Sequence, residues 1–452
     1  MKFKSDFCII IAAGFLILYA NYQAIMNMFM PGLIKDLYLV FFAALGLAPL
    51  FFRDRKLSKA HIRVLIPWAL LMCEIVFNRN QDLANGFIQF FVRTLAGVSI
   101  MFMGLCGLRW QKHLLRTITG IGMPNVIATY LFLVLPGLYK IMLRIYPVIP
   151  NGTSGGTAGY RAGLQNHYSQ NGTLIAFVLL ILAGYLLYYV TEVRRMHYPT
   201  LIMTVLTFGA LILTSKRAHF LFVIVAVCAV YFIANPKQIL GRGFKLFAAV
   251  LLGAAALYFM SFHVTAIQTL LARFMTVGND SQTRTRFKMW ALAIELFRKN
   301  PIMGIGWGGY KHIYAVELYK DWQTAGAKYL NSHNTYLQLL CETGVTGFLI
   351  YLWAVLGTLF TTAKALMYRR SLEPWRRKIL YVSVLSQVFV LFYNFTGNTL
   401  YDYTIIMYSF TAMTGLAVLR ETCTGEELPG KETCPDLTVE SYPGTLIAES
   451  ES

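Results

Sequence analysis

The chain has 452 residues, of which 57% are hydrophobic and only 13% are charged, and its formal net charge is +19. An ordinary soluble domain has about a quarter of its residues charged, so this composition and the mean hydropathy of +0.54 exclude a string of soluble domains. The apolar residues form blocks of about 16–25, the length of a helix that crosses a ~30 Å hydrocarbon layer. The composition therefore predicts an all-α polytopic membrane protein.

About twelve transmembrane helices are expected from these blocks. In chain order they cover residues 7–28, 33–52, 63–77, 86–108, 118–145, 172–191, 199–214, 219–235, 246–262, 345–363, 379–395 and 402–419. Basic connections, such as residues 53–59 and 364–378, fall on every second loop, on the same side as Lys2 and Lys4. The positive-inside rule makes that side cytoplasmic. Both termini are thus expected in the cytoplasm, and the net charge requires no nucleic-acid partner.

The spans divide the chain into segments of different character. We expect membrane helices 1–5 in residues 1–145, helices 6–9 with short external loops in 146–262, one large external loop in 263–344, helices 10–12 in 345–419, and a disordered cytoplasmic tail in 420–452. The tail is rich in acidic residues, Thr, Ser, Pro and Gly, a composition typical of disorder. The large loop has helical periodicity in two stretches. It is therefore expected to form an external subdomain containing short helices.

Basic residues recur on the outer side, where the positive-inside rule disfavours them. They are Arg161, Lys216, Arg217, Arg273, Arg284, Arg286, Lys288 and Lys311. A cation at the membrane rim is costly to desolvate, and the guanidinium group of arginine binds phosphate oxygens in a bidentate manner. Any single one of these residues is explained better by contact with lipid headgroups. Their convergence from separate segments instead favours a site for an anion at the outer leaflet, such as a lipid-linked pyrophosphate.

Two arginines stand out among these outer-side residues. Arg217 lies beside Lys216 in a turn of about four residues between two apolar spans, so its charge must stay near the interface. Arg286 and Trp290 are four residues apart and share one face of an amphipathic helix. Arg284 would point elsewhere on that helix, so Arg284 and Arg286 are not expected to enter one site.

His333 is the candidate general base. In a helix that starts here, Glu342 falls on the opposite face and is a poor candidate to orient the imidazole. Next to basic residues the imidazole is expected to be neutral, and a neutral imidazole can accept a proton from a sugar hydroxyl. In isolation a structural histidine would be the better interpretation, and the outer-side cations reverse that preference. The sequence shows no cluster of metal-ligating residues, and no cofactor is expected.

Taken in order, these segments resemble the O-antigen ligase/polymerase superfamily of bacterial membrane glycosyltransferases, over residues 161–402. The similar motifs are Arg161-Ala-Gly-Leu-Gln-Asn-His167, Thr214-Ser-Lys-Arg217, Arg286-x-x-x-Trp290 with Asn300-Pro-Ile-Met-Gly-Ile-Gly-Trp-Gly308, and His333-Asn-Thr-Tyr-Leu-Gln-Leu-Leu-Cys-Glu-Thr-Gly344. Lys216 is an insertion relative to the Ser-Arg turn of the family.

The resemblance implies that a glycan is transferred from undecaprenyl pyrophosphate to an acceptor sugar outside the cytoplasm, with inversion at the anomeric carbon. It implies no metal ion and no nucleotide sugar. Arg161, Arg217 and Arg286 would bind the pyrophosphate, and His333 would activate the acceptor hydroxyl. Further candidates for contacts with the substrates are Lys216, Arg284, Trp290, Asn334, Tyr336 and Asn398.

The acceptor stays open at this point. A polymerase, which joins lipid-linked repeat units, and a ligase, which attaches finished polymer to a lipid core, fit the motifs equally well. A transporter or flippase of a lipid-linked oligosaccharide is the alternative from another class. Transporters carry polar groups near the bilayer midplane and paired interrupted helices, whereas polarity here gathers on one face. A flippase would also have no need of a base at His333.

Overall fold

The protein is described here by a computed structural model, which covers residues 2–22, 26, 32–51, 59–79, 87–105, 110–145, 159–165, 167–234, 239–275, 281–317 and 330–423. Within these ranges the chain is helical and has no strand, apart from an isolated bridge between Arg79 and Trp307. Residues 420–423 continue the last helix, and the rest of the tail expected from the sequence lies outside the described residues.

The longer helices correspond to the apolar blocks of the sequence. They are α1 (Lys2–Asn21), α3 (Gly32–Leu47), α4 (Lys59–Phe77), α5 (Phe87–Ile100), α6 (Gln111–Val134), α8 (Tyr168–Tyr188), α9 (Tyr198–Leu213), α10 (Arg217–Ile233), α11 (Ile239–Ser261), α15 (Thr335–Tyr368), α16 (Pro374–Tyr393) and α17 (Thr404–Cys423). The other described α-helices are α7 (Pro136–Ile145), α12 (Thr265–Met275), α13 (Ser281–Lys299) and α14 (Gly309–Glu317).

Three helical segments among the described residues are long and apolar enough to cross a membrane: Gln111–Val134, Tyr168–Val193 and Thr335–Tyr368. Other apolar helices are shorter, for example Tyr198–Leu213 and Arg217–Ile233. In a bilayer an unpaired backbone N–H or C=O group is costly, and a helix satisfies these groups internally. The protein is therefore an all-α membrane protein.

One expected span is wrong in its extent. The sequence predicts a single helix over residues 118–145, but α6 ends at Val134 and α7 starts at Pro136. Leu135 between them has φ −123° and ψ 74°, outside the helical region. A residue that precedes proline is disfavoured in the α conformation because the proline ring crowds its backbone. Pro136 therefore separates α7 from the apolar helix before it.

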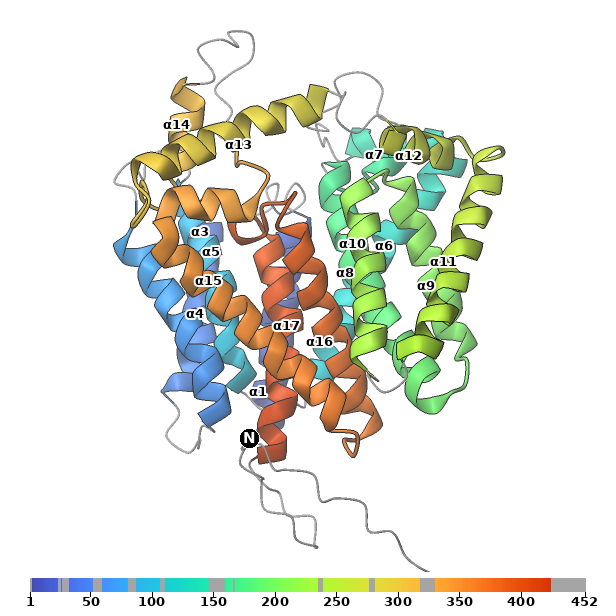
Figure 1. The fold of residues 1–452 in the computed structure, drawn as a ribbon, viewed down its shortest axis with the longest axis horizontal. Coiled ribbons are helices and arrows are strands. Elements are labelled where there is room, and N and C mark those ends of the chain that lie inside the picture. The colour runs from blue at the N-terminus through green and yellow to red at the C-terminus, as the bar shows by residue number, and fades with distance from the viewer. Residues whose placement is uncertain are drawn as a thin grey trace, which may run out of the picture.

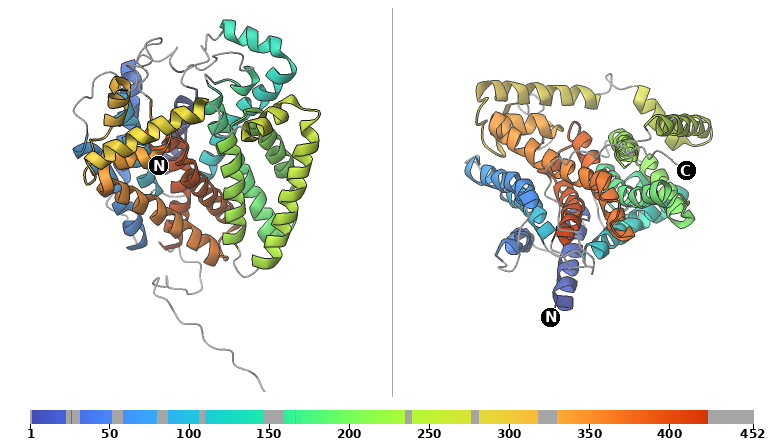
Figure 2. Two further views of the ribbon diagram at one scale, coloured as in Figure 1. Left: turned by 45° about the horizontal axis from the view of Figure 1, so that its top comes forward. Right: turned by 60° about the horizontal axis from the view of Figure 1, so that its bottom comes forward.

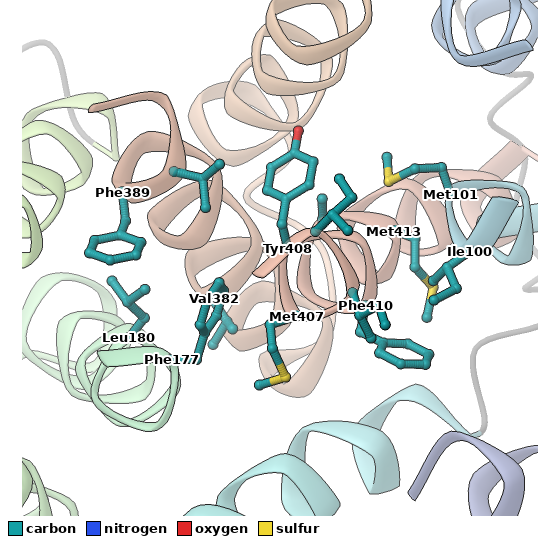
Figure 3. Close-up of a cluster of buried hydrophobic side chains, with 14 of the residues drawn as sticks. Ile100, Met101, Phe177, Leu180, Val382, Phe389, Met407, Tyr408, Phe410 and Met413 are labelled. Carbon is teal, nitrogen blue, oxygen red and sulfur yellow. The ribbon is translucent and has the colours of Figure 1, made fainter. Parts of the chain in front are cut away.

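The centre of the molecule is formed by α8, α16 and α17 (Figures 1 and 3). Phe177 of α8 and Phe389 of α16 meet edge to face, with their ring centroids 5.9 Å apart. A Cβ atom at Gly184 would lie 2.7 Å from Val382, so the helices α8 and α16 can approach this closely only with glycine there. Small residues at crossings of membrane helices allow such packing. This core fixes the ends of α8, α10 and α16, which carry several of the candidate site residues.

The helices α7, α12, α13 and α14 lie across one end of the bundle (Figure 1). Figure 1 shows α13 and α14 over α15, and α7 and α12 over the other half of the molecule. The N-terminus of α1 lies at the opposite end, and the last turn of α17 does too. The described residues of the segment 263–344 thus contribute the helices α12, α13 and α14 and a loop to one face of the molecule.

The glycine-rich loop before α14 interlocks with a break in α15. Gly344 has φ +63° and ψ −165° inside α15, and a Cβ atom there would lie 2.1 Å from the carbonyl oxygen of Ile302. A Cβ atom at Gly304 would lie 2.3 Å from the backbone of Glu342. Backbone hydrogen bonds join Ile305 to Cys341, Gly306 to Glu342, Val345 to Pro301 and Thr346 to Ile302. The backbone groups at the break in α15 therefore find their hydrogen-bond partners in the loop, and the two segments form one unit.

Candidate functional site

The segment that carries His333 is held by a set of short polar contacts. The backbone N–H of Ser332 donates to Gln338 at 3.0 Å, and the Ser332 hydroxyl accepts from Asn334 N–H at 3.2 Å. The Asn334 side chain accepts from Leu337 N–H at 3.1 Å and so caps α15. These contacts keep His333 at φ +55°, a left-handed conformation that residues other than glycine rarely adopt. Such strain often marks a functional position.

A second segment supports the imidazole from the loop between α16 and α17. Asn398 Nδ2 lies 3.2 Å from His333 Nδ1. The N–H of Thr335 donates to the carbonyls of Asn394 and Gly397, at 2.8 and 3.1 Å. The start of α15 and the loop before α17 therefore form one rigid support for the ring.

The surroundings of His333 are basic. Burial is the main cause that lowers its pKa to about 3, and the positive charges of Arg286 and Lys216 lower the pKa further. His167, the N-cap residue of α8, acts in the same direction and has its own pKa lowered to about 4 by burial and by Lys216. Burial and the neighbouring positive charges thus both favour the neutral imidazole that the sequence predicts. The cations come from α13 and from the turn between α9 and α10.

Lys216 and Arg217 separate at the start of α10. Lys216 is the N-cap residue of the helix, and its ammonium group lies 4.4 Å from the centroid of the Tyr168 ring. Of the two cations, Lys216 is the one whose charge lowers the pKa of His333. Arg217 is the first residue of the helix. Neighbouring positions on a helix differ by about 100° in direction. The inserted lysine therefore takes a position toward His333 in this turn.

Arg161 lies close to the start of α8. Its backbone carbonyl accepts a hydrogen bond from Asn171 Nδ2 at 3.0 Å, and its guanidinium lies 5.9 Å from the centroid of the Tyr160 ring. Its Nε atom is buried and has no hydrogen-bond partner among the described residues. A buried donor without a partner is costly. Arg161 therefore has capacity to bind an anion.

The residues of α13 divide as the helical periodicity predicts. Arg286 is half-buried, and its charge lowers the pKa of His333, whereas Arg284 is exposed. Trp290 donates its indole N–H to the carbonyl of Ser332 at 3.0 Å. This hydrogen bond holds the backbone of Ser332, the residue directly before His333, against α13.

The remaining candidates make contacts within the protein. Asn334 forms the cap of α15 described above. Tyr336 donates its hydroxyl hydrogen to the carbonyl of Leu391 in α16, at 2.7 Å, and lies edge to face with Phe395. Glu342 points away from His333 and accepts from Tyr310 N–H at 3.1 Å. These contacts fix α15 against its neighbours.

Two residues near the site were not identified from the sequence. His167 closes the motif that begins at Arg161, but its place next to His333 depends on how α8 meets α15. Arg93 lies in α5, where a charge inside an apolar block is itself a signal of function. Among the described residues, no group of three or more His, Cys, Asp or Glu could hold a metal ion.

A comparison with protein families bears on this geometry. Residues 202–352 match the family model of the O-antigen ligase. The match covers about a third of the chain and supports its resemblance to the O-antigen ligase/polymerase superfamily. The region of the match includes the turn at Lys216, helix α13 and His333, whereas Arg161 and Asn398 lie outside it. No curated protein matches the chain. The match supports a membrane glycosyltransferase of the O-antigen ligase/polymerase type in general.

Proposed function

We propose that this protein transfers a glycan from undecaprenyl pyrophosphate to the hydroxyl of an acceptor sugar, on the outer face of the bacterial cytoplasmic membrane. The observation that carries the proposal is the neutral His333 with cations from α13 and from the α9–α10 turn around it. A base for the acceptor and cations for the leaving group are the two requirements of this transfer.

In the proposed reaction the pyrophosphate lies against Arg286, Lys216 and Arg161. The acceptor hydroxyl attacks the anomeric carbon as the bond from that carbon to the pyrophosphate oxygen breaks. His333 takes the hydroxyl proton, and the lipid pyrophosphate leaves with the electron pair of the broken bond. The cations stabilise its developing charge without a metal ion. Attack opposite the leaving group inverts the configuration.

Asn398 has a positioning role in this mechanism. Its Oδ1 atom is buried and without a hydrogen-bond partner among the described residues, while its Nδ2 atom lies near His333 Nδ1. Amide oxygen and nitrogen exchange places by a 180° rotation. With Oδ1 toward the ring, Asn398 accepts Nδ1–H and leaves Nε2 of His333 free to accept the proton of the hydroxyl.

The proposed orientation in the membrane follows from the loop charges and from the arrangement of the helices. We assign twelve spans, with α13 and α14 outside and both termini in the cytoplasm. Figure 1 supports this, since the N-terminus and the last turn of α17 lie at the end opposite to α13. The acceptor decides between polymerase and ligase, and the donor-side residues fit both.

The test is turnover of purified protein in nanodiscs with a lipid-linked glycan from the native host. We expect the wild type to release lipid pyrophosphate and to form a larger glycan. His333→Ala should bind the donor but lose turnover by at least about 100-fold, since general base catalysis contributes 10²–10⁴-fold. His263→Ala, at an exposed histidine between α11 and α12, is the matched control and should keep turnover.

The same assay separates the alternatives. The acceptor end of the product identifies a polymerase or a ligase. Wild-type turnover in His333→Ala would contradict the role of His333. Movement of the lipid across a liposome membrane without a new glycosidic bond would identify a flippase and overturn the proposal.

A further inference from the structure

A second pair of cations lies beside the catalytic segment, in a part of the molecule that the proposed reaction does not use. Lys311 of α14 has its ammonium group 4.6 Å from the centroid of the Phe90 ring, and Arg93 of α5 has its guanidinium 5.7 Å from the same centroid. Arg93 also lies 4.5 Å over the ring of Tyr403. One cation thus comes from the external subdomain and the other from a membrane helix.

The protein leaves hydrogen-bonding capacity on both cations. Arg93 Nη2 donates to the carbonyl of Tyr401 at 2.8 Å, but its Nε atom is buried without a partner among the described residues. Lys311 makes no hydrogen bond or ion pair with any residue that the structure describes, and its contact is the Phe90 ring. Unused donors on two neighbouring cations are suited to an anion with several oxygens.

One oxygen of each nearby carboxylate accepts hydrogen bonds from groups other than the two cations. Asp402 accepts from the backbone N–H of Thr404 at 2.8 Å, and Glu342 accepts from Tyr310 N–H and from Gln338 Nε2. Burial and the charge of Arg93 lower the pKa of Lys311 to about 8, and the attraction of Glu342 and Asp402 does not restore it. Lys311 thus stays mostly protonated at neutral pH, near two carboxylates but without a hydrogen bond to either of them.

The depth of the site favours a lipid-borne group. Arg93 lies in the second turn of α5, about 9 Å along the helix at 1.5 Å per residue, and Lys311 lies in the external subdomain. A group held between them is at the level of lipid headgroups. The 3-10 turn Thr399–Tyr401 separates this pair from the catalytic base, because Asn398 before the turn contacts His333 and Tyr401 at its end contacts Arg93.

We infer that Lys311 and Arg93 bind a phosphoryl group carried by the acceptor lipid, next to the donor site at Arg286 and Lys216. The inference rests on the proposed function and extends it, because it makes the acceptor a phosphate-bearing lipid. Two phosphoryl sites on either side of His333 would bring the two lipid-linked substrates together with the hydroxyl of one facing the anomeric carbon of the other.

The test counts bound molecules of farnesyl pyrophosphate by native mass spectrometry of the full-length protein. We expect two on the wild type, one on Lys311→Met, one on Arg286→Gln and none on the double variant. Lys288→Met, at an exposed lysine of α13, is the matched control and should keep two. Two molecules on Lys311→Met would overturn the inference.

Other outcomes distinguish this inference from the proposed function. A single molecule on the wild type that is lost in Arg286→Gln would leave the donor site standing and remove the second site. No binding on the wild type would remove both. If phosphatidylglycerol displaces the second molecule as readily as farnesyl pyrophosphate itself does, the site is a general headgroup site and the acceptor role is wrong.

Kinetics and stability separate binding from a structural role. In Lys311→Met the KM for the acceptor should rise at least about tenfold with kcat unchanged, the loss expected for a hydrogen bond to a charged group. The midpoint of thermal unfolding should stay equal or rise, because the methionine removes a charge that its surroundings disfavour. A lower midpoint with an unchanged KM would show that Lys311 only ties the subdomain to α5.

Discussion

At the scale of residues, the site joins a strained backbone to a neutral ring. His333 keeps φ +55° because Ser332, Asn334 and Gln338 hold the backbone on both sides of it. A residue in such a conformation costs on the order of 1–3 kcal/mol, which a glycine would avoid. We therefore attribute the presence of histidine at this strained position to its imidazole side chain.

The lowered pKa of His333 gives a prediction for the pH dependence of activity. The imidazole has a pKa of about 3 in the folded protein, against 6.5 when unperturbed. The folded state thus keeps the ring neutral where the unfolded chain takes up a proton, so stability from this group is full above pH 6.5 and is lost toward pH 3. We expect kcat/KM, which reports the free enzyme, to show no acidic limb near pH 6.5. A limb with its midpoint there would contradict the assignment of His333.

Asn398 offers a second prediction at this scale. Asn398→Ala should lower kcat about 10- to 100-fold through the lost orientation of the ring, while the dissociation constant for the donor stays the same. Asn398→Asp should keep more activity, since a carboxylate accepts Nδ1–H, and should move the acidic limb of the pH profile upward. If Asn398→Asp is as inactive as Asn398→Ala with no shift of the limb, Asn398 does not act through His333.

At the scale of elements, the interlock of the glycine-rich loop with α15 is the part most sensitive to substitution. Gly344→Ala adds a methyl group 2.1 Å from the Ile302 carbonyl at a residue with φ +63°. We expect the free energy of unfolding to fall by at least about 1–3 kcal/mol and turnover to fall with it. Gly357→Ala, later in the same helix and 3.7 Å from the nearest atom of Trp353, is the control and should be tolerated. Equal unfolding midpoints for the two variants would contradict this account.

The same elements show how much of the structure can be predicted from the sequence. Apolar length is a local property, so it predicts the helices. The side of the membrane that the basic residues face stays a prediction from the loop charges. Which cation of the α9–α10 turn faces His333 depends on a single step around a helix, and the sequence favoured Arg217 over Lys216 for the catalytic role. The pairing of Arg93 with Lys311 required the docking of the external subdomain on α5, which no local pattern encodes. The break before Pro136 has a local signal, because a residue that precedes proline is disfavoured in the helical conformation. The prediction of one helix over residues 118–145 does not include this signal.

At the scale of the whole molecule, the proposed orientation can be tested by chemical labelling. In a background without reactive cysteine, Lys288→Cys on the exposed face of α13 should react with a membrane-impermeant maleimide in intact spheroplasts. Ser371→Cys, in the exposed turn between α15 and α16, should react only after the membrane is opened. The opposite pattern would reverse the orientation and place the site in the cytoplasm.

The support that His333 receives from later parts of the chain has a consequence for biosynthesis. The Thr335 hydroxyl bonds to the Gly397 carbonyl, 62 positions further along the chain, and the imidazole contacts Asn398, 65 positions further. These residues follow α15 in the chain and insert into the membrane after it. A nascent chain that stops after α15 thus carries its histidine without the groups that hold it. The proposed role of His333 therefore predicts that the protein has no activity until the final pair of helices inserts.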